Sequence, residues 1–290
     1  MLNLKYSSDL YDSDKVFYCP SQLGYKNFEL QYQNYIINQD NKLGIYVSEI
    51  FEIKNILNNG INVIPDGCND IIIIYDENNI YSYLSPSLRN IENFCFSDKY
   101  TILGIRFLPG ATASILKEDM CNILESTPRI NYFLEDFDKI EHLIMKSTSF
   151  KERCKIIISY LEKKFEYKDL KQLIINHSVN KIITSKGNYT IEDLSRETGY
   201  SSRYIRKLFK YYVGHNPKEL SNIIRIQNMI NYLYNNSGDN LSYIALEWGF
   251  SDQSHMNRES KRYLNTTVGD IKNNINWINN LSVSLKRSFF

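Results

Sequence analysis

A four-residue turn pattern occurs twice in the chain, fifty positions apart, at 199–202 and at 249–252. Each copy begins with a glycine, continues with an aromatic residue and a serine, and ends with a residue that can cap a helix. Apolar residues three and four positions apart lie on both sides of each copy. The repeat predicts two short helix pairs, each joined by a tight turn, so the last third of the chain is constrained to a helical fold.

The first predicted unit covers 190–213. Thr190 is suited to cap its first helix, and Gly199 can end that helix because glycine adopts the left-handed backbone conformation without steric cost. The second helix is predicted from Ser202 to Tyr212, with a basic outer face of the kind that a major groove accepts. On a lone helix, the same face would indicate only a solvated surface. The candidate DNA contacts are Ser202, Arg203, Arg206, Lys207 and Lys210.

The second predicted unit covers 241–265, with its second helix over 252–264. Trp248 and Phe250 are predicted to lie in the core. Amide side chains on the second helix are suited to adenine or to the DNA backbone. His255 has two interpretations, a direct contact with DNA or a purely structural role. The candidate DNA contacts of this unit are Asp252, Gln253, His255, Asn257 and Arg258.

A long amphipathic helix is predicted between the units, from Pro217 to Tyr234, because proline suits the first turn of a helix. At 1.5 Å per residue it would be about 27 Å long. Two recognition helices on one face of DNA lie about 34 Å apart, which such a helix can span once the width of both units is added. The residues expected to pack against both units are Ile223, Ile226, Ile230 and Leu233.

The motifs of both units resemble those of one known family. In the second unit, an Ile-Ala pair at 244–245 precedes the segment Gly-Phe-Ser-Asp-Gln-Ser-His at 249–255. The first unit matches at Leu194, Gly199, Ser201, Leu208, Phe209, Gly214 and Pro217. Over about 173–272, the chain resembles the AraC/XylS family of transcription activators.

The resemblance implies that the helices at 202–212 and 252–264 enter successive major grooves of double-stranded DNA. It also implies sequence-specific transcription regulation, and RNA polymerase as a protein partner. An alternative that this resemblance leaves open is a DNA-repair methyl-acceptor enzyme, since such tandem units also occur fused to those domains. That chemistry needs an activated cysteine, usually held by zinc.

The second unit departs from the family pattern at four positions. Glu259 replaces a small residue and Ser260 replaces an apolar aromatic one, while Asn265 and Val268 stand where glycine and proline are usual. Replacing a core aromatic costs on the order of a few kcal/mol in a close-packed site. We therefore expect this unit to be less rigid or differently packed. An interaction protein, or a weak DNA binder with an eroded second unit, is the other alternative function.

Before residue 169, the sequence pattern is first typical of β-strands and then typical of helices. The four isoleucines at 71–74 indicate a strand buried on both faces, and 76–79 indicates a hairpin turn. Strands are predicted over 46–53, 71–75, 80–83 and 101–108, and helices over 111–116, 132–145 and 150–165.

The predicted fold class is α+β. We expect a β-rich, barrel- or cupin-like N-terminal domain with following helices over 1–168. An all-α tandem helix-turn-helix domain is expected over 169–274, and a C-terminal tail over 275–290. The boundary is placed in the polar stretch 166–169.

Two motifs in the N-terminal domain, at 65–70 and 104–110, resemble those of a domain found on some AraC-type regulators. By position, that domain is expected to sense a small-molecule effector or to form a homodimer. The candidate ligand-binding residues are Asp66, Cys68, Asp70 and Arg106. The alternative is that 65–67 is only a turn and that Arg106 pairs with a buried carboxylate.

Composition narrows the classes of protein to which the chain can belong. Residues 1–170 hold 18 Lys+Arg and 24 Asp+Glu, whereas 171–272 hold 14 and 9, which favours a polyanion as partner of the C-terminal part. No apolar run reaches the ~20 residues of a membrane span, and the start lacks a signal pattern, so we expect a cytoplasmic protein. The five scattered cysteines predict free buried thiols without a metal or cofactor. No catalytic motif is found, so the sequence predicts a protein that is not an enzyme.

Overall fold

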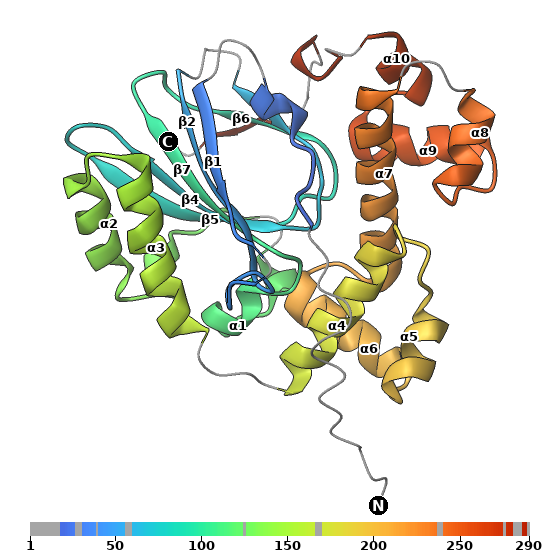
Figure 1. Ribbon diagram of the computed structural model, residues 1–290, viewed down its shortest axis with the longest axis horizontal. Helices are drawn as coiled ribbons and strands as arrows, with labels where there is room; N and C mark the ends of the chain where they lie inside the picture. Colours follow the sequence, from blue (N-terminus) through green and yellow to red (C-terminus); the bar gives the residue numbers. More distant parts are fainter. Residues whose placement is uncertain are drawn as a thin grey trace, which may run out of the picture.

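The N-terminal half of the chain is built on a five-stranded antiparallel sheet in the order β1-β2-β7-β4-β5 (Figure 1). The structure is a computed structural model that describes residues 18–26, 31–38, 40–55, 60–123, 126–165, 170–236, 240–274, 277–280 and 286–288. The strands are Gln31–Ile36 (β1), Val47–Lys54 (β2), Asn69–Tyr75 (β4), Ile80–Ser85 (β5) and Thr101–Phe107 (β7). The three central strands are buried over almost their whole length, as the isoleucine run predicts.

A second sheet of three strands has the order β3-β6-β8. Its strands are Ile61–Val63 (β3), Glu92–Cys95 (β6) and Lys286–Ser288 (β8). The segment predicted as a tail therefore supplies a strand, which pairs in parallel with β6. Phe51, Ile72 and Phe94, from both sheets, share one apolar cluster with Tyr25 of the 3₁₀ helix η2 (Leu23–Lys26). The expected β-rich N-terminal domain is confirmed.

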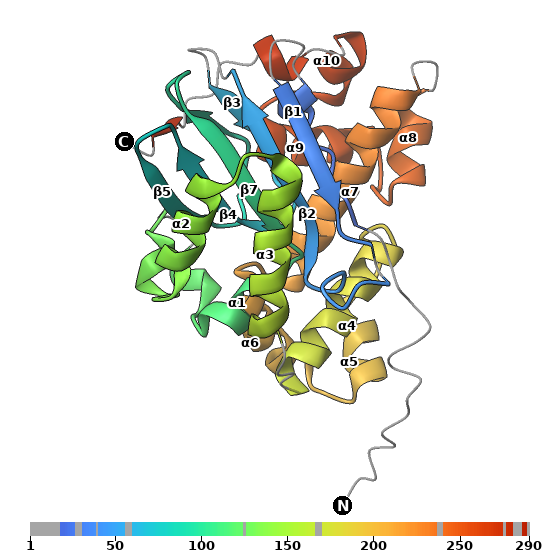
Figure 2. The ribbon, with the colours of Figure 1, turned by 60° about the vertical axis from the view of Figure 1, so that its left-hand side comes forward.

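The sheet is followed by α1 (Thr112–Leu116), η3 (Met120–Asn122), η4 (Ile130–Tyr132), α2 (Phe137–Lys146) and α3 (Phe150–Lys164). Of these, α2 and α3 lie over one face of the sheet (Figure 2). Ser149 caps α3 by accepting a hydrogen bond from the backbone of Glu152. The ring of Phe165, just past α3, stacks on Tyr46 with centroids 4.1 Å apart, which ties this helix to the start of β2.

The C-terminal part is helical, as expected. Its elements are α4 (Leu170–Thr184), α5 (Ile191–Thr198), α6 (Ser202–Val213), α7 (Pro217–Asn235), α8 (Leu241–Glu247), α9 (Gln253–Leu264), α10 (Val268–Asn273) and η5 (Trp277–Asn280). Figure 1 shows α7 as an upright helix, with α5 and α6 at one end and α8 and α9 at the other. Among the described helices, none has the length and apolar character needed to cross a membrane.

The four predicted strands are confirmed to within two residues at their ends, and the turn at 76–79 is closed by a 2.9 Å hydrogen bond from Asp76 N to Asn79 O. Strands β1, β3 and β6 were not predicted, because they are short or mostly polar. The helix predicted over 132–145 begins only at Phe137, since 130–132 forms a separate 3₁₀ turn. The polar boundary stretch 166–169 lies outside the described residues.

Gly104 lies on the face of β7 that looks toward the second sheet, between Ile102 and Arg106. A Cβ atom at this position would lie 2.0 Å from Cζ of Phe51 on the neighbouring strand β2. The phenyl ring of Phe51 thus fills the space that a side chain would take, and its own exposed fraction is only 1%. The close packing of this face requires glycine at 104.

We predict that Gly104→Ala lowers the free energy of unfolding by about 1–3 kcal/mol, because the ring of Phe51 must move in a close-packed core. In a Phe51→Leu background, the same substitution should cost clearly less. Gly269→Ala is the matched control, since a Cβ there meets no atom closer than 3.7 Å. Denaturant unfolding measures the free energy of unfolding of each variant. An equal cost of Gly104→Ala in both backgrounds would contradict this account.

Candidate DNA interface and effector pocket

The first helix-turn-helix unit is fixed by local caps that the sequence predicts. Thr190 and Asp193 form a reciprocal capping box at the start of α5. Gly199 ends α5 in the left-handed conformation, with φ of 73°. Ser201 then caps α6 by accepting a hydrogen bond from the backbone of Tyr204. These contacts set the turn between the helices independently of the rest of the chain.

Helix α6 presents its predicted contact residues outward. Ile205, Leu208 and Phe209 are buried on its inner face, where α6 packs against α1, α4 and η3. Ser202 is half-buried at the start of the helix. The exposed residues of the outer face are Arg203, Arg206, Lys207 and Lys210. The structure therefore leaves a run of four cations free to meet phosphates or base edges.

In the second unit, Asp252 is the N-cap of α9 and accepts a 2.7 Å hydrogen bond from His255 N. This use fits a structural role for Asp252, although its side chain is exposed. The ring of His255 packs edge-on against Phe250, and its Nδ1 accepts a hydrogen bond from the backbone of Ser251. Trp248 and Phe250 are buried, as expected.

The remaining candidates on α9 divide into two groups. Asn257 is half-buried, and its Oδ1 accepts a 3.1 Å hydrogen bond from Val268 N, so this side chain holds the start of α10. Gln253 and Arg258 are exposed. Sequence reasoning missed Lys261 and Arg262, which are also exposed. Their spacing of three and four from Arg258 places them on the same face and could have revealed them.

The departures of the second unit from the family pattern are accommodated by different packing. Ser260 is fully buried, and its hydroxyl donates a 2.8 Å hydrogen bond to Thr266 O. Glu259 accepts a hydrogen bond from Asn222 of α7. Asn265 adopts the left-handed conformation in which glycine is usual, and Val268 is buried. Each of the four residues thus has a defined place in the packing of this unit.

The apolar stripe of α7 divides between the two units. Leu220 and Ile224 belong to the cluster that contains the first unit and the five-stranded sheet, whereas the four residues named from the sequence belong to the cluster of the second unit. The expectation that those four contact both units is therefore wrong. Side chains at successive positions of a helix point in different directions, so one stripe cannot face both units.

The loop that precedes the first unit touches the second unit directly. The loop between α4 and α5 reaches the turn of the second unit, where Lys186 Nζ lies 4.8 Å from the ring centroid of Trp248. A Cβ on Gly249 would lie 2.0 Å from Oδ1 of Asn188. This loop is a second link between the units in addition to α7.

The turns in the two N-terminal motifs, around Gly67 and Gly110, pack against helices of the C-terminal part. A Cβ on Gly67 would lie 2.6 Å from Cδ1 of Leu220 on α7, and a Cβ on Gly110 would lie 2.6 Å from Cγ2 of Ile175 on α4. Gln227 of α7 donates a 2.8 Å hydrogen bond to Pro65 O. Both motifs thus position the C-terminal helices.

Arg106 lies at the centre of a buried charge cluster and is 1% exposed. Its guanidinium donates hydrogen bonds of 2.9 and 3.1 Å to Asp70, and one of 3.2 Å to Glu49. Asp66 Oδ2 lies 3.7 Å from its Nε. The interpretation in which Arg106 pairs with a buried carboxylate matches this geometry. Glu49 is a member that sequence reasoning missed, because its side chain is brought in only by the pairing of β2 with β7.

The cluster holds three carboxylates around a single guanidinium. Burial, opposed by Arg106 and reinforced by the neighbouring carboxylates, raises the pKa of Asp70 to about 6 and also raises the pKa of Asp66. Burial and the nearby Asp66 raise the pKa of the Cys68 thiol, which stays protonated at neutral pH. Cys68 is therefore a buried, neutral thiol.

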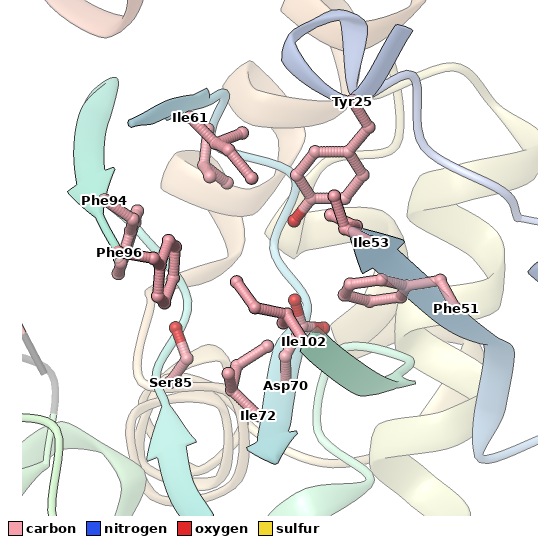
Figure 3. A pocket seen from close by; sticks show the side chains of 11 residues that line it. Tyr25, Phe51, Ile53, Ile61, Asp70, Ile72, Ser85, Phe94, Phe96 and Ile102 are labelled. Atoms are coloured by element: carbon pink, nitrogen blue, oxygen red, sulfur yellow. The ribbon is translucent and has the colours of Figure 1, made fainter. Parts of the chain in front are cut away.

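A small cavity lies between the two sheets, next to this cluster (Figure 3). Its volume is about 30 Å³, and most of its lining is apolar. Of the four candidate ligand residues, only Asp70 lines it. The other lining residues include Tyr25, Phe51, Phe94 and Phe96. A cavity of this size holds about one or two waters, so a larger ligand must displace side chains.

A family model for a helix-turn-helix domain matches residues 194–274, which include α6, α7, α8 and α9. Residues 194–274 thus form a helix-turn-helix domain. A DNA-binding transcription regulator is the function that this domain supports. No protein of curated function matches the chain in sequence.

Solved structures of ToxT from Vibrio cholerae are similar to this chain. An apo variant from strain SCE256 is 16% identical, with 85% of this chain and 97% of that chain covered and a TM-score of 0.36. A form bound to an unsaturated fatty acid is 15% identical, with 85% and 95% covered and a TM-score of 0.36. A form from strain O395 bound to a naphthalenyl butenoic acid is 17% identical, with 84% and 98% covered and a TM-score of 0.34.

We predict that Arg106→Met lowers the free energy of unfolding by about 3–5 kcal/mol at pH 7.5, because it leaves three buried carboxylates without their cation. Carboxyls whose pKa is raised by folding stabilise the protein below that pKa and lose this contribution as pH rises. The cost should therefore be smaller at pH 5 than at pH 7.5. Denaturant unfolding at both pH values measures this cost. A variant that folds at pH 5 but fails to fold at pH 7.5 would show the same effect in its extreme form.

Lys164→Met is the control for the buried charge cluster, since the pair of Lys164 with Asp136 is partly exposed. Its loss should cost at most about 1 kcal/mol. A cost of Arg106→Met that is equal at the two pH values would contradict the charge account.

Proposed function

We propose that the protein regulates transcription by binding double-stranded DNA with α6 and α9 in successive major grooves. The observation that carries this proposal is the pair of capped helices with exposed cations, joined by one buried helix, α7. At 19 residues, α7 is about 28 Å long, close to one turn of DNA once the flanking helices are added. The same exposed cations weigh against an interaction protein that does not bind DNA.

We assign roles within the interface from exposure and chemistry. Arg203 and Arg206 on the first two turns of α6 contact base edges or phosphates, and Lys207 and Lys210 contact phosphates. On α9, the exposed Gln253 and Arg258 contact DNA, and Ser202 and Asp252 lie at the starts of the two helices. His255 and Asn257 hold the second unit in shape. The DNA-binding domain covers 169–274, with units at 190–213 and 241–265.

We further propose that the N-terminal domain, over 1–168, controls DNA binding through a small-molecule effector. The cavity between the sheets is the candidate place, with Asp70 and Ser85 as polar groups at its side and Arg106 behind Asp70. Because aromatic and aliphatic side chains line it, the effector is expected to be largely apolar and to open the cavity on binding. Cys68 and Asp66 keep structural roles in the turn at 65–68.

RNA polymerase and a second copy of the chain are the protein partners that fit transcription regulation at paired DNA sites. We also propose that the protein acts in the cytoplasm and is not an enzyme. Within the described residues, no group of three or more His, Cys, Asp or Glu residues is placed to hold a metal.

We predict that Arg203→Ala with Arg206→Ala weakens DNA binding by about 1–3 kcal/mol for each base contact that it removes. For each phosphate contact that it removes, the magnitude of the slope of log affinity against log salt concentration should fall by about one. The reason is that each neutralised phosphate releases a counterion on binding. Mobility-shift titrations at several salt concentrations measure both quantities.

Lys151→Ala with Lys155→Ala is the matched control. It removes the same charge from the exposed side of α3, far along the chain from both units. If this control weakened binding as much as the α6 double variant, the loss would reflect net charge alone and the assignment of α6 would fail.

The two units are expected to require a fixed distance between their two half-sites on DNA. In a DNA site selected from random sequence by the purified protein, insertion of about five base pairs between the two half-sites moves the second onto the opposite face. Because α7 and the α4–α5 loop fix the two units, we expect affinity to fall to that of a single half-site. Affinity that tolerates the insertion would show that one unit alone binds.

A further inference from the structure

The loop between α4 and α5 has a backbone shape that few residue types adopt without strain. Lys186 and Gly187 both lie in the left-handed region, with φ of 55° and 82°. Such a φ is uncommon for a residue with a long side chain, so the surrounding contacts hold Lys186 in this conformation. Hydrogen bonds of 2.9 Å from Lys186 N to Ile183 O and of 2.7 Å from Gly187 N to Ile182 O contribute to this. The loop is therefore a defined structural element.

This loop lies directly on α7. Gly187 is buried, and a Cβ atom there would lie 2.3 Å from Ser221 O and 2.8 Å from Cγ of Arg225. No side chain fits between the loop and the helix at this point. Arg225 also donates a 3.1 Å hydrogen bond from Nε to Gly187 O. The loop that precedes the first unit is thus attached to the first half of α7.

The loop also reaches the second unit through Lys186. Its Nζ lies 4.8 Å from the ring centroid of Trp248, and a cation is attracted by the π electrons of an indole ring. Trp248 is buried in the core of the second unit together with Met256 and Leu264 of α9. Its ring also lies 5.6 Å from that of Tyr232 on α7. Lys186 therefore connects the loop to the core against which α9 packs.

Glu259 adds a polar contact on α9. This residue is one of the departures of the second unit from the expected pattern, and it is half-buried. Its carboxylate accepts a 2.9 Å hydrogen bond from Asn222, which lies three positions before Arg225 on the same face of α7. Burial lowers the pKa of Arg225, and the negative charge of Glu259 opposes this shift. The loop, α7 and α9 thus share one cluster of polar contacts.

We propose that Lys186, Arg225 and Glu259 fix the orientation of α9 relative to α6, and thereby determine the half-site spacing that the protein accepts on DNA. The apolar stripe of α7 serves the two units with different residues, so a direct link between them adds a constraint that this stripe does not supply. The three are positioning residues, whose role requires no contact with DNA. The effect on spacing rests on the proposed function, whereas the fixed orientation does not.

The first test measures the orientation in the full chain without DNA. Spin labels carried by unnatural amino acids replace the exposed Lys210 of α6 and Arg258 of α9, and pulsed electron resonance gives the distance between them. The chain with these labels alone should give one narrow distance distribution, which Glu259→Ala and Lys186→Met should each broaden or shift. Glu247→Ala, which removes an exposed carboxylate at the end of α8, should leave it unchanged. An unchanged distribution in Glu259→Ala or Lys186→Met would overturn the role of that residue.

The second test measures the preference for spacing, by mobility shift on a site that the purified protein selects from random sequence. One base pair inserted or removed between the half-sites rotates the second by about a tenth of a turn. The native chain should prefer the selected spacing, and Glu259→Ala and Lys186→Met should each reduce this preference about fivefold, as expected for the loss of one charged contact. Lys186→Arg keeps a cation over the indole ring and should retain the preference.

The controls separate orientation from charge. Glu247→Ala and Lys155→Met match the two charge changes and should keep the native preference for spacing. If Lys186 acted only as a phosphate contact, Lys186→Met would weaken binding equally at every spacing, and its positioning role would be overturned. If the native chain preferred no spacing, the proposed binding of two grooves would fail, while the distance measurement without DNA would still decide the orientation.

Discussion

The burial of α7 is the interaction on which the rest of the structure depends. Leu220 and Ile224 lie in the core shared by the first unit and the five-stranded sheet, whereas Ile226 and Ile230 lie in the core of the second unit. That second core also takes Ile91 from the N-terminal part. Because interiors packed at this density resist relative movement, the two recognition helices are held at a separation that neither unit could define alone.

Local features were predictable from sequence because their causes are local, whereas roles set by tertiary contacts were not. The caps at Thr190 and Ser201 act within a few residues of their own positions. Asn257 has the side chain and the position of a base contact, yet its Oδ1 accepts a hydrogen bond from a backbone N–H of α10. Glu49 joins Arg106 only because β2 pairs with β7. A sequence pattern identifies a face of a helix or strand, but not which atoms will occupy it.

Ser260 shows how the second unit keeps its shape without the usual aromatic side chain. A serine in a core would leave a void and an unsatisfied hydroxyl, but here the hydroxyl binds Thr266 O just past the end of α9. Asn265 then ends α9 in the left-handed conformation, which asparagine tolerates better than most residues. The departures therefore act together as an alternative helix ending, and the sequence differences alone do not indicate loss of DNA binding.

The buried charge cluster and α7 are connected by a single turn. Asp70, at the cavity between the sheets, binds Arg106, and Arg106 lies beside Asp66 at the start of the turn. The next residue in that turn is Gly67, which is packed against Leu220 of α7. A ligand that changes the position or protonation of Asp70 therefore acts on groups in direct contact with the turn that holds α7. Since both recognition helices are fixed by α7, a small displacement at the cavity has a contiguous physical route to the DNA interface.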